Sequence, residues 1–371
     1  MIPFLDLKAQ YRSIQEPLER SVLEALRSCD YVLGEPVRQF EAAFAAYCGA
    51  SEAISLNSGT SALHLALLAA GIRPGDEVVT VPMTFVATVA AILYADATPI
   101  LVDVDADTFT MSPEALKAAI TPRTRAIIPV HLHGRLANIE EICEIARRHG
   151  IPVIEDAAQA HGAERGGRKA GTFGTMGCFS FYPGKNLGAC GEGGAIVTND
   201  PEIASTLRSL RDWGQEGKYN HVRHGFNYRM DTIQAAALEV KLRYLPEWTR
   251  ARQRIAALYD RLLAESGLSI PQPCGLDHVY HVYAVCVKDR DRIRTQLAEA
   301  GISTGIHYPR PVHMQPAYAG RVVGDHRFPV SEWLADHFLS LPIFPEMTEE
   351  QVFAVVDALL QCVQDQQVEM A

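Results

Sequence analysis

The sequence predicts an α/β protein with a mainly parallel central sheet covered by helices on both faces, and a smaller α+β domain at the carboxyl end. Short apolar runs alternate with helical segments between residues 53 and 198, which is typical of parallel strands joined by helices. The runs are almost continuously apolar, as strands buried on both faces are. With 371 residues, the chain is also long enough for two domains.

The amino-terminal part is predicted to be helical after a short extended arm over residues 1–12. Residues 13–28 place five apolar side chains on one stripe of a helix, with charged residues opposite. These five are Ile14, Leu18, Val22, Leu23 and Leu26. A second amphipathic helix is predicted for residues 36–47.

The alternating region is predicted to supply the strands and helices of the central sheet. The strand candidates are residues 53–56, 77–81, 99–102, 126–130, 153–155, 178–182 and 195–198. The helix candidates are residues 61–70, 84–95, 113–119, 138–149 and 200–212. In such a sheet, ligand-binding groups gather at the carboxyl ends of the strands.

Residues 231–265 are strongly helical but contain Pro246, so we expect two helices with a break at that proline. The break predicts a domain boundary between a large domain, residues 1–245, and a small domain, residues 246–371. Within the small domain we expect a strand at 283–287 and helices at 289–300 and 348–363.

Composition excludes several classes of function. The formal net charge is −10 and no basic run is present, which argues against binding to nucleic acid or to an anionic membrane. The eight cysteines include no C-x-x-C pair, which favours reduced thiols. No segment approaches the roughly 20 apolar residues of a membrane span. We therefore expect a soluble cytoplasmic protein.

The segment Asn57-Ser58-Gly59-Thr60-Ser61 lies between a predicted strand and an apolar helix. Free backbone N–H groups, short hydroxyls and the positive end of the helix dipole make this position suitable for a phosphate group. The same residue types are also ordinary helix N-caps, so the segment alone leaves both interpretations open.

Lys185 and Asp156 are the candidate reactive groups. Pro183-Gly184 ends an apolar strand and places Lys185 at its terminus, before a glycine-rich stretch that can lie close to a bound molecule. Asp156 ends another apolar strand, where a buried carboxylate is costly unless it meets a cation or several donors. Taken singly, Lys185 could also be an exposed loop lysine and Asp156 a member of a structural salt bridge.

Together, these three features predict pyridoxal 5'-phosphate as the cofactor, with pyridoxamine 5'-phosphate as its aminated form. The aldehyde of this cofactor forms a Schiff base with a lysine, its ring nitrogen is kept protonated by a carboxylate, and its phosphate binds at a helix terminus. Phe85 follows the second strand and is placed to cover the ring, although an aromatic side chain there is otherwise a core residue.

Five motifs, in order, make the chain similar to a known family. They are SGTSALH, PMTFVAT, EDAAQAHG, SFYPGKNLG and GFNYRMD. Their order and spacing resemble the DegT/DnrJ/EryC1/StrS family of sugar aminotransferases over nearly the whole chain. The resemblance implies a fold-type-I aminotransferase that forms a homodimer, with pyridoxal phosphate at the subunit interface.

The resemblance also implies roles for individual residues. Lys185 is expected to form the Schiff base and to move the proton, Asp156 to pair with the ring nitrogen, and Gln159 to bond the ring hydroxyl. The expected phosphate ligands are Gly59, Thr60, Ser61 and Ser180, with Asn227 from the neighbouring subunit. The expected substrate-side residues are Tyr182, Arg229, His307, Tyr308 and His313. Arg229 is equally suited to a structural ion pair with Asp231.

The implied amino donor is L-glutamate and the implied acceptor is a nucleotide-linked ketosugar. Tyr182-Pro183-Gly184 is more similar to members that act at C3 of a dTDP- or UDP-linked 3-keto hexose than to those that act at C4. Two different functions on the same scaffold are a pyridoxal-phosphate-dependent sugar dehydratase and a non-catalytic, sugar-responsive regulator. Lys185 argues against the dehydratase, whose members have histidine there, and the full set of Lys185, Asp156 and Gln159 argues against the regulator.

The pair His131 and His133 is the one feature that suggests a metal. Two side chains at this spacing give only two ligands, and no cluster of cysteines or carboxylates supports them. We therefore predict no metal site. The family often has tyrosine where this chain has His133, which makes position 133 a candidate for substrate contact.

Overall fold

The computed structural model describes residues 1–323 and 327–369. Within them, the central sheet contains seven strands in the order β3-β2-β4-β5-β8-β9-β1, because parallel bridges Ile127 to Val153 and Val130 to Asp156 join its two halves. The strands are β1 (Glu52–Leu56), β2 (Glu77–Thr80), β3 (Thr98–Leu101), β4 (Thr124–Ile127), β5 (Ile154–Asp156), β8 (Met176–Ser180) and β9 (Gly194–Thr198).

Only one of these seven strands, β9, runs antiparallel to its neighbours. The pairs β2–β3, β2–β4 and β5–β8 are parallel, so the prediction of a mainly parallel sheet is confirmed. A short hairpin outside the sheet is formed by β6 (Glu164–Arg165) and β7 (Arg168–Lys169).

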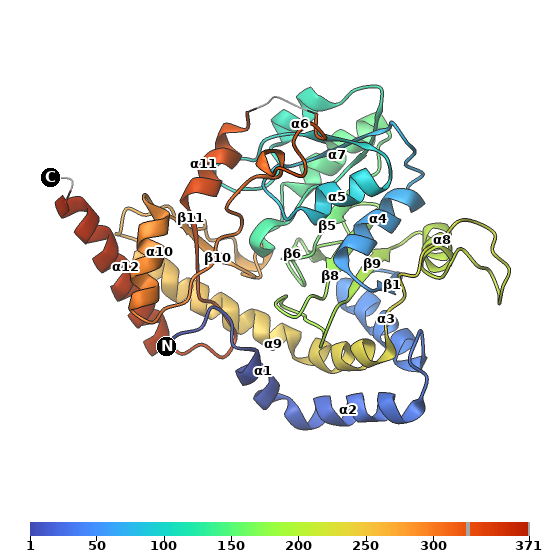
Figure 1. Ribbon diagram of the computed structural model, residues 1–371, viewed down its shortest axis with the longest axis horizontal. Helices are drawn as coiled ribbons and strands as arrows, with labels where there is room; N and C mark the ends of the chain where they lie inside the picture. The colour runs from blue at the N-terminus through green and yellow to red at the C-terminus, as the bar shows by residue number, and fades with distance from the viewer. Residues whose placement is uncertain (324–326, 370–371) are drawn as a thin grey trace.

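Helices cover both faces of the sheet, as the apolar strands predict (Figure 1). The alternation of side chains along β8 separates the two cores: Phe179 packs in one with residues of α3 and α9, and Cys178 in the other with residues of α4 and α8. The helices of the large part are α3 (Glu35–Cys48), α4 (Gly59–Ala69), α5 (Ala87–Tyr94), α6 (Pro113–Ala119), α7 (Ile139–His149) and α8 (Pro201–Arg211).

The amino terminus differs from the expected arm. After a short extended stretch, the chain forms α1 (Leu7–Ser13) and then α2 (Gln15–Ser28). The carboxylate of Asp6 accepts a hydrogen bond from the backbone N–H of Ala9 at 2.8 Å, which caps α1. The prediction that residues 1–12 are all extended is therefore wrong, because this cap starts a helix at Leu7.

The expected break at Pro246 is also wrong. A single helix, α9 (Thr232–Leu263), continues through the proline and in Figure 1 runs from below the central sheet to the small carboxyl-terminal unit. Proline removes one hydrogen bond of the helix. Buried side chains hold the helix on both sides of it, Leu242 and Leu245 before and Trp248 and Ala251 after. The division at residue 245 thus stays a prediction, and it falls within a helix.

The carboxyl-terminal part is a smaller α+β unit, as predicted. Strands β10 (Tyr283–Cys286) and β11 (Phe338–Leu341) pair antiparallel. Its helices are α10 (Arg290–Glu299), α11 (Pro329–His337) and α12 (Glu349–Glu369). A separate core joins β10, β11, α10 and α12 to the second half of α9, from Ile255 to Leu263, whereas Leu334 and Ala335 of α11 pack in a core of the large part. None of the described helices is long and apolar enough to cross a lipid bilayer.

Candidate active site

A cavity of about 680 Å³ opens at the carboxyl ends of the strands, where the fold predicts a ligand. Its walls come from the segments that follow β1, β2, β5 and β8, together with α9 and the small carboxyl-terminal unit. Ten of the residues predicted from the sequence line it: Gly59, Thr60, Phe85, Asp156, Gln159, Ser180, Tyr182, Lys185, His307 and Tyr308.

Asp156 is buried at the end of β5 and lines the cavity. The hydroxyl of Thr88 donates to its Oδ2 at 2.7 Å, and the backbone N–H of Ala158 donates to its Oδ1 at 3.2 Å. Burial raises the pKa of the Asp156 carboxyl, while these two hydrogen bonds and the charge of Lys185 lower it. The preceding residue, Glu155, is on the opposite face of the strand, where it accepts from two backbone N–H groups and from His131.

Lys185 is held at the cavity by the tight turn after β8, where its backbone N–H donates to the carbonyl of Tyr182 at 2.8 Å. Burial lowers the pKa of the Lys185 amine to about 8, against an opposing influence of the Asp156 charge. The amine and the carboxylate thus act on each other's ionisation, and both line one cavity. They follow different strands, β8 and β5, so the sequence predicts their meeting only through the cofactor that both would bind.

The start of α4 forms the expected cradle. Ser58 caps the helix by accepting from the N–H of Ser61 at 3.1 Å. Gly59 lies against Ser180 so closely that a Cβ on the glycine would sit 2.7 Å from the Cβ of Ser180. Because of this close packing, the helix N–H groups, Thr60 and Ser180 border the same end of the cavity.

A hydrogen-bond network fixes Gln159 at the cavity wall. Its Oε1 accepts from the N–H of His133 at 2.6 Å, and its Nε2 donates to the hydroxyl of Tyr308 at 2.9 Å. The Nε2–H of His133 donates to the carbonyl of His307 at 2.9 Å. Burial lowers the pKa of His133 to about 4, so this histidine is a neutral donor that positions the wall.

Aromatic side chains and the amino-terminal arm line part of the cavity. The ring of Phe85 lies 5.8 Å from that of Tyr308, and the ring of Phe4 stacks on His307 at 5.6 Å. The arm is anchored on both sides of Ile2, whose N–H donates to Gly301 and whose carbonyl accepts from Ser303. Phe4 and Leu5 therefore form part of the wall.

Four of the predicted residues do not line the cavity of their own chain. Ser61 is buried and its hydroxyl donates to Asn57 at 2.6 Å. Arg229 forms an ion pair with Asp212 at 3.1 Å, rather than with Asp231. His313 lies 3.2 Å from the carboxylate of Glu332. Asn227 is exposed on the segment between α8 and α9.

Sequence reasoning missed several residues of the cavity. Thr88, His281 and Arg252 line it, and the aromatic arm residue Phe4 does so as well. Thr88 belongs to the motif PMTFVAT, which was a usable signal. His281 and Arg252 carry no local pattern that links them to the strand ends.

Within the described residues, no group of three or more histidine, cysteine, aspartate or glutamate side chains is arranged to hold a metal ion. The pair of histidines at 131 and 133 has other partners. His131 donates from Nε2 to Glu155 at 2.9 Å, while His133 bonds His307.

Comparison with known proteins identifies the family. Residues 12–360 match the DegT/DnrJ/EryC1/StrS aminotransferase family. The chain belongs to this family. The match covers nearly the whole chain and confirms the resemblance that the five motifs indicate.

Three members of the DegT/DnrJ/EryC1/StrS family illustrate the similarity. The pleiotropic regulatory protein of Geobacillus stearothermophilus is 45% identical over 362 residues, which cover 96% of this chain and 97% of the relative. The dTDP-3-amino-3,4,6-trideoxy-alpha-D-glucose transaminase of Streptomyces venezuelae is 44% identical over 360 residues, with 96% and 95% covered. The UDP-2-acetamido-2-deoxy-3-oxo-D-glucuronate aminotransferase of Pseudomonas aeruginosa is 41% identical over 360 residues, with 97% and 99% covered.

Solved structures of DegT/DnrJ/EryC1/StrS proteins and other aminotransferases match the fold. The crystal structure of S. venezuelae DesV in complex with a ketimine intermediate has a TM-score of 0.95 at 44% identity, covering 98% of both chains. That of NtdA from Bacillus subtilis with bound cofactor PMP has a TM-score of 0.88 at 33% identity, covering 95% of this chain and 82% of the other. These matches confirm the predicted aminotransferase fold.

Proposed function

We propose that this protein is a pyridoxal 5'-phosphate-dependent aminotransferase that passes the amino group of L-glutamate to C3 of a dTDP- or UDP-linked 3-keto hexose. The observation that carries the proposal is the meeting of Lys185 and Asp156 in one cavity with a helix-terminus cradle. The names of relatives support the reaction, since the S. venezuelae relative is named for a 3-amino sugar and the P. aeruginosa relative for a 3-oxo sugar.

The residues present fit the cofactor. The packing of Gly59 on Ser180, which a Cβ would block, leaves backbone N–H groups and hydroxyls free to hold a phosphate. Asp156 would pair with the ring nitrogen, Gln159 would bond the ring hydroxyl, and Phe85 would cover the ring. When bound, pyridoxal phosphate would supply an aldehyde and an electron-accepting ring.

The chain's own groups then have distinct tasks. Asp156 favours the protonated ring nitrogen because a buried carboxylate stabilises a nearby positive charge. Lys185, with its pKa lowered to about 8, is about one-tenth neutral at pH 7, far more than an ordinary lysine, so its Nζ can accept a proton from the substrate carbon and return it. The aromatic wall and the arm border the space in which this transfer would take place.

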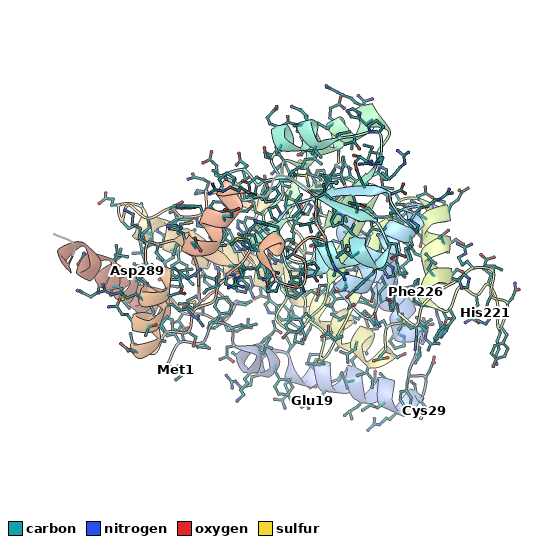
Figure 2. All side chains as sticks on the ribbon, turned by 45° about the horizontal axis from the view of Figure 1, so that its top comes forward. Met1, Glu19, Cys29, His221, Phe226 and Asp289 are labelled. Atoms are coloured by element: carbon teal, nitrogen blue, oxygen red, sulfur yellow. The ribbon has the colours of Figure 1, made fainter. Side chains whose placement is uncertain are left out.

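A homodimer would complete the site. Asn227 lies on an exposed segment between α8 and α9, and Figure 2 shows the part around His221 extending away from the body of the molecule. The same segment exposes Trp213 and Tyr219, by 50% and 78%. Large exposed aromatic side chains favour contact with another subunit. In such a dimer Asn227 would reach the phosphate of the neighbouring site. Mass determination in solution tests this, and a monomer with full activity contradicts it.

The function is tested with purified protein loaded with pyridoxal phosphate. L-Glutamate should bleach the violet-absorbing form, and a panel of dTDP- and UDP-linked amino sugars should do so in the reverse direction. The 3-amino sugars should react faster than the 4-amino sugars. Lys185→Ala should lose the reaction while the protein stays folded, and full transamination by this variant refutes the assigned base.

A regulator on the same scaffold is the second candidate, favoured by the name of the G. stearothermophilus relative. The two functions make different demands on Lys185. A regulator needs the cavity but no reactive amine, so Lys185→Ala would keep sugar binding and lose nothing else. None of the eight cysteines, all of which lie within the described residues, is in a disulfide, which supports our proposal of a cytoplasmic location for either function.

A further inference from the structure

His281 is a histidine of the cavity wall to which the proposed reaction gives no task. It lies just before strand β10 and lines the same cavity as Lys185. Its side chain is half-buried, whereas Tyr280 and Val282 on either side of it are buried. His281 therefore belongs to the surface that a bound molecule would meet.

Asn186, the residue after Lys185, fixes which nitrogen of the His281 ring carries the proton. Its Nδ2 donates to the backbone carbonyl of Val279 at 3.0 Å, and this bond turns its Oδ1 toward Nδ1 of His281 at 3.3 Å. An amide oxygen can only accept a hydrogen bond, so Nδ1 of the imidazole must be the donor. A neutral imidazole has one ring proton, so Nε2 keeps a free lone pair.

Nε2 of His281 is an unused acceptor at the cavity surface. It has no hydrogen-bond partner among the described residues, and it is not enclosed as the two unpaired ring nitrogens of His161 are. Burial and the positive charge of Lys185 hold the pKa of His281 well below its ordinary value. Arg252, His307 and His161 act on this pKa in the same direction. Nε2 thus stays unprotonated and can accept a hydrogen bond.

The amine of Lys185 is the complementary group. Its Nζ has no hydrogen-bond partner among the described residues either, and it is not enclosed. An ammonium group has three N–H donors, so it needs acceptors while it is detached from the cofactor. Of the other acceptors in the wall, Asp156 would pair with the cofactor ring and Gln159 already accepts from His133. Nε2 of His281 has no such commitment.

Two observations place the lysine and the histidine close together. Asn186 contacts His281 and is joined to Lys185 in the chain, and Lys185 has the largest electrostatic influence on the pKa of His281 among the described residues. The other histidine of the cavity wall, His307, differs in one respect. Its Nδ1 lies 2.9 Å from the hydroxyl of Ser340, which can donate or accept, so this contact does not fix its tautomer.

We propose that Nε2 of His281 accepts a hydrogen bond from the amine of Lys185 while this amine is detached from the cofactor, and so holds the amine in place for proton transfer. This inference rests on the proposed aminotransferase function. His281 is a positioning residue that acts through Lys185, and Asn186 acts through His281 by fixing its tautomer. The transferred proton stays on Nζ until it is returned, because the imidazole is a weaker base than the amine.

The first experiment observes the imidazole in the cofactor-free full-length protein, by NMR after labelling of histidine with ¹⁵N. The signals of His281 are identified by their loss in His281→Gln. We expect Nδ1 to carry the proton, Nε2 to be unprotonated, and the Nε2 signal to shift when Lys185→Met removes the donor. A protonated Nε2, or a signal that Lys185→Met does not move, overturns the proposal.

The second experiment measures the pKa of Lys185 from the pH dependence of covalent capture of pyridoxal phosphate. An acceptor stabilises the ammonium form, so its removal in His281→Leu should lower the midpoint by about one unit. His281→Gln keeps a carbonyl acceptor and should restore most of the midpoint. An unchanged midpoint in His281→Leu, or an equal shift in both variants, contradicts the hydrogen bond.

The third experiment measures turnover of the holoenzyme with L-glutamate and with L-glutamate deuterated at Cα. In His281→Leu, kcat should fall on the order of tenfold and the isotope effect should increase, because a misplaced amine slows proton transfer. The KM for L-glutamate should change less than about twofold. His281→Gln should recover most of kcat.

His278→Phe is the matched control for removal of a histidine from this segment. His278 is buried, and its Nδ1 accepts from the backbone N–H of Tyr280. It is not part of the cavity wall. Its replacement should therefore leave the isotope effect unchanged, even where it lowers stability. A fall in kcat shared by His278→Phe and His281→Leu, with no change of the isotope effect in either, overturns the positioning role.

The remaining outcomes separate this inference from the function itself. A wild-type holoenzyme that reacts with no amine contradicts the proposed aminotransferase, and the NMR experiment still decides whether the hydrogen bond exists. A wild type that reacts, with His281→Leu keeping its kcat and its isotope effect, contradicts only the role of His281.

Discussion

At the scale of a single residue, Thr88 influences the pKa of the buried carboxyl group of Asp156. Its hydroxyl donates to Asp156 at 2.7 Å, with a longer contact of 3.3 Å to the carbonyl of Phe85, and accepts from Thr84 at 2.8 Å. This bond lowers the pKa of Asp156 against the effect of burial. Thr88 is therefore a positioning residue for the group that pairs with the cofactor ring.

Thr88→Val should raise the pKa of Asp156 further, because the carboxylate loses a donor. We expect kcat to fall about tenfold or more, since one hydrogen bond to a charged group is worth roughly 1.5–3 kcal/mol. The acid limb of the kcat profile should move to higher pH, and Thr88→Ser should restore it. An unchanged acid limb in Thr88→Val would show that the bond does not control Asp156.

The lowered pKa of Lys185 predicts how cofactor uptake depends on pH. Only the neutral amine attacks an aldehyde, so covalent capture by the cofactor-free protein should rise with pH around a midpoint near 8, rather than near the ordinary value of 10.5. In Asp156→Asn the midpoint should be lower still, because the carboxylate charge favours the ammonium form. Borohydride trapping at a series of pH values measures this midpoint. A midpoint that rises in Asp156→Asn would contradict the proposed effect of the Asp156 charge on the pKa of Lys185.

At the scale of an element, the start of α4 works as a cradle only because it lies against the end of β8. Gly59→Ala should weaken cofactor binding on the order of tenfold or more, since overpacking of such a contact costs about 1–3 kcal/mol. The new Cβ would sit 2.7 Å from the Cβ of Ser180.

Ser180→Gly provides the matched control for this packing argument. It removes the Cβ that the new alanine would meet, so the double variant should bind the cofactor better than the two single effects together predict. Fluorescence titration with pyridoxal phosphate gives the four constants of the cycle. If the effects of the two substitutions on the free energy of cofactor binding simply add, the contact between Gly59 and Ser180 is not the cause of the weaker binding.

At the same scale, some elements could be predicted from the sequence and others could not. The strand ends carrying Asp156 and Gly59 were predictable, because each follows a strongly apolar run and begins a local motif. The second strand of the small unit, β11, was not predicted, since its partner β10 lies far away in the sequence. The continuous helix through Pro246 was missed for a related reason: packing on both sides outweighs a local preference.

At the scale of the molecule, α9 connects the two cores. Its first half packs with Phe179 and Phe181 beneath the central sheet, and its second half packs with the small carboxyl-terminal unit. The cavity lies between these parts and takes residues from both. Arg252 was beyond sequence reasoning because its place in the site depends on how the two cores are joined.

This continuity predicts the pattern of limited proteolysis. In monomeric protein, trypsin should cut first at Lys218 and Arg223, on the segment between α8 and α9 that is exposed in a single chain, and only later near Pro246, where the helix protects Arg243 and Arg250. Mass spectrometry of the early fragments shows which of these two pairs of sites is cut first. First cleavage at Arg243 or Arg250 would indicate a flexible boundary at the proline after all.

The anchored amino terminus has a practical consequence for anyone who prepares this protein. Phe4 and Leu5 border the cavity, and their position depends on the pairing of Ile2 with Gly301 and Ser303. Trimming by an aminopeptidase or translation from a later start codon would leave some molecules with a missing wall. Batches should therefore be compared by intact mass, and purification tags are better placed after the last helix.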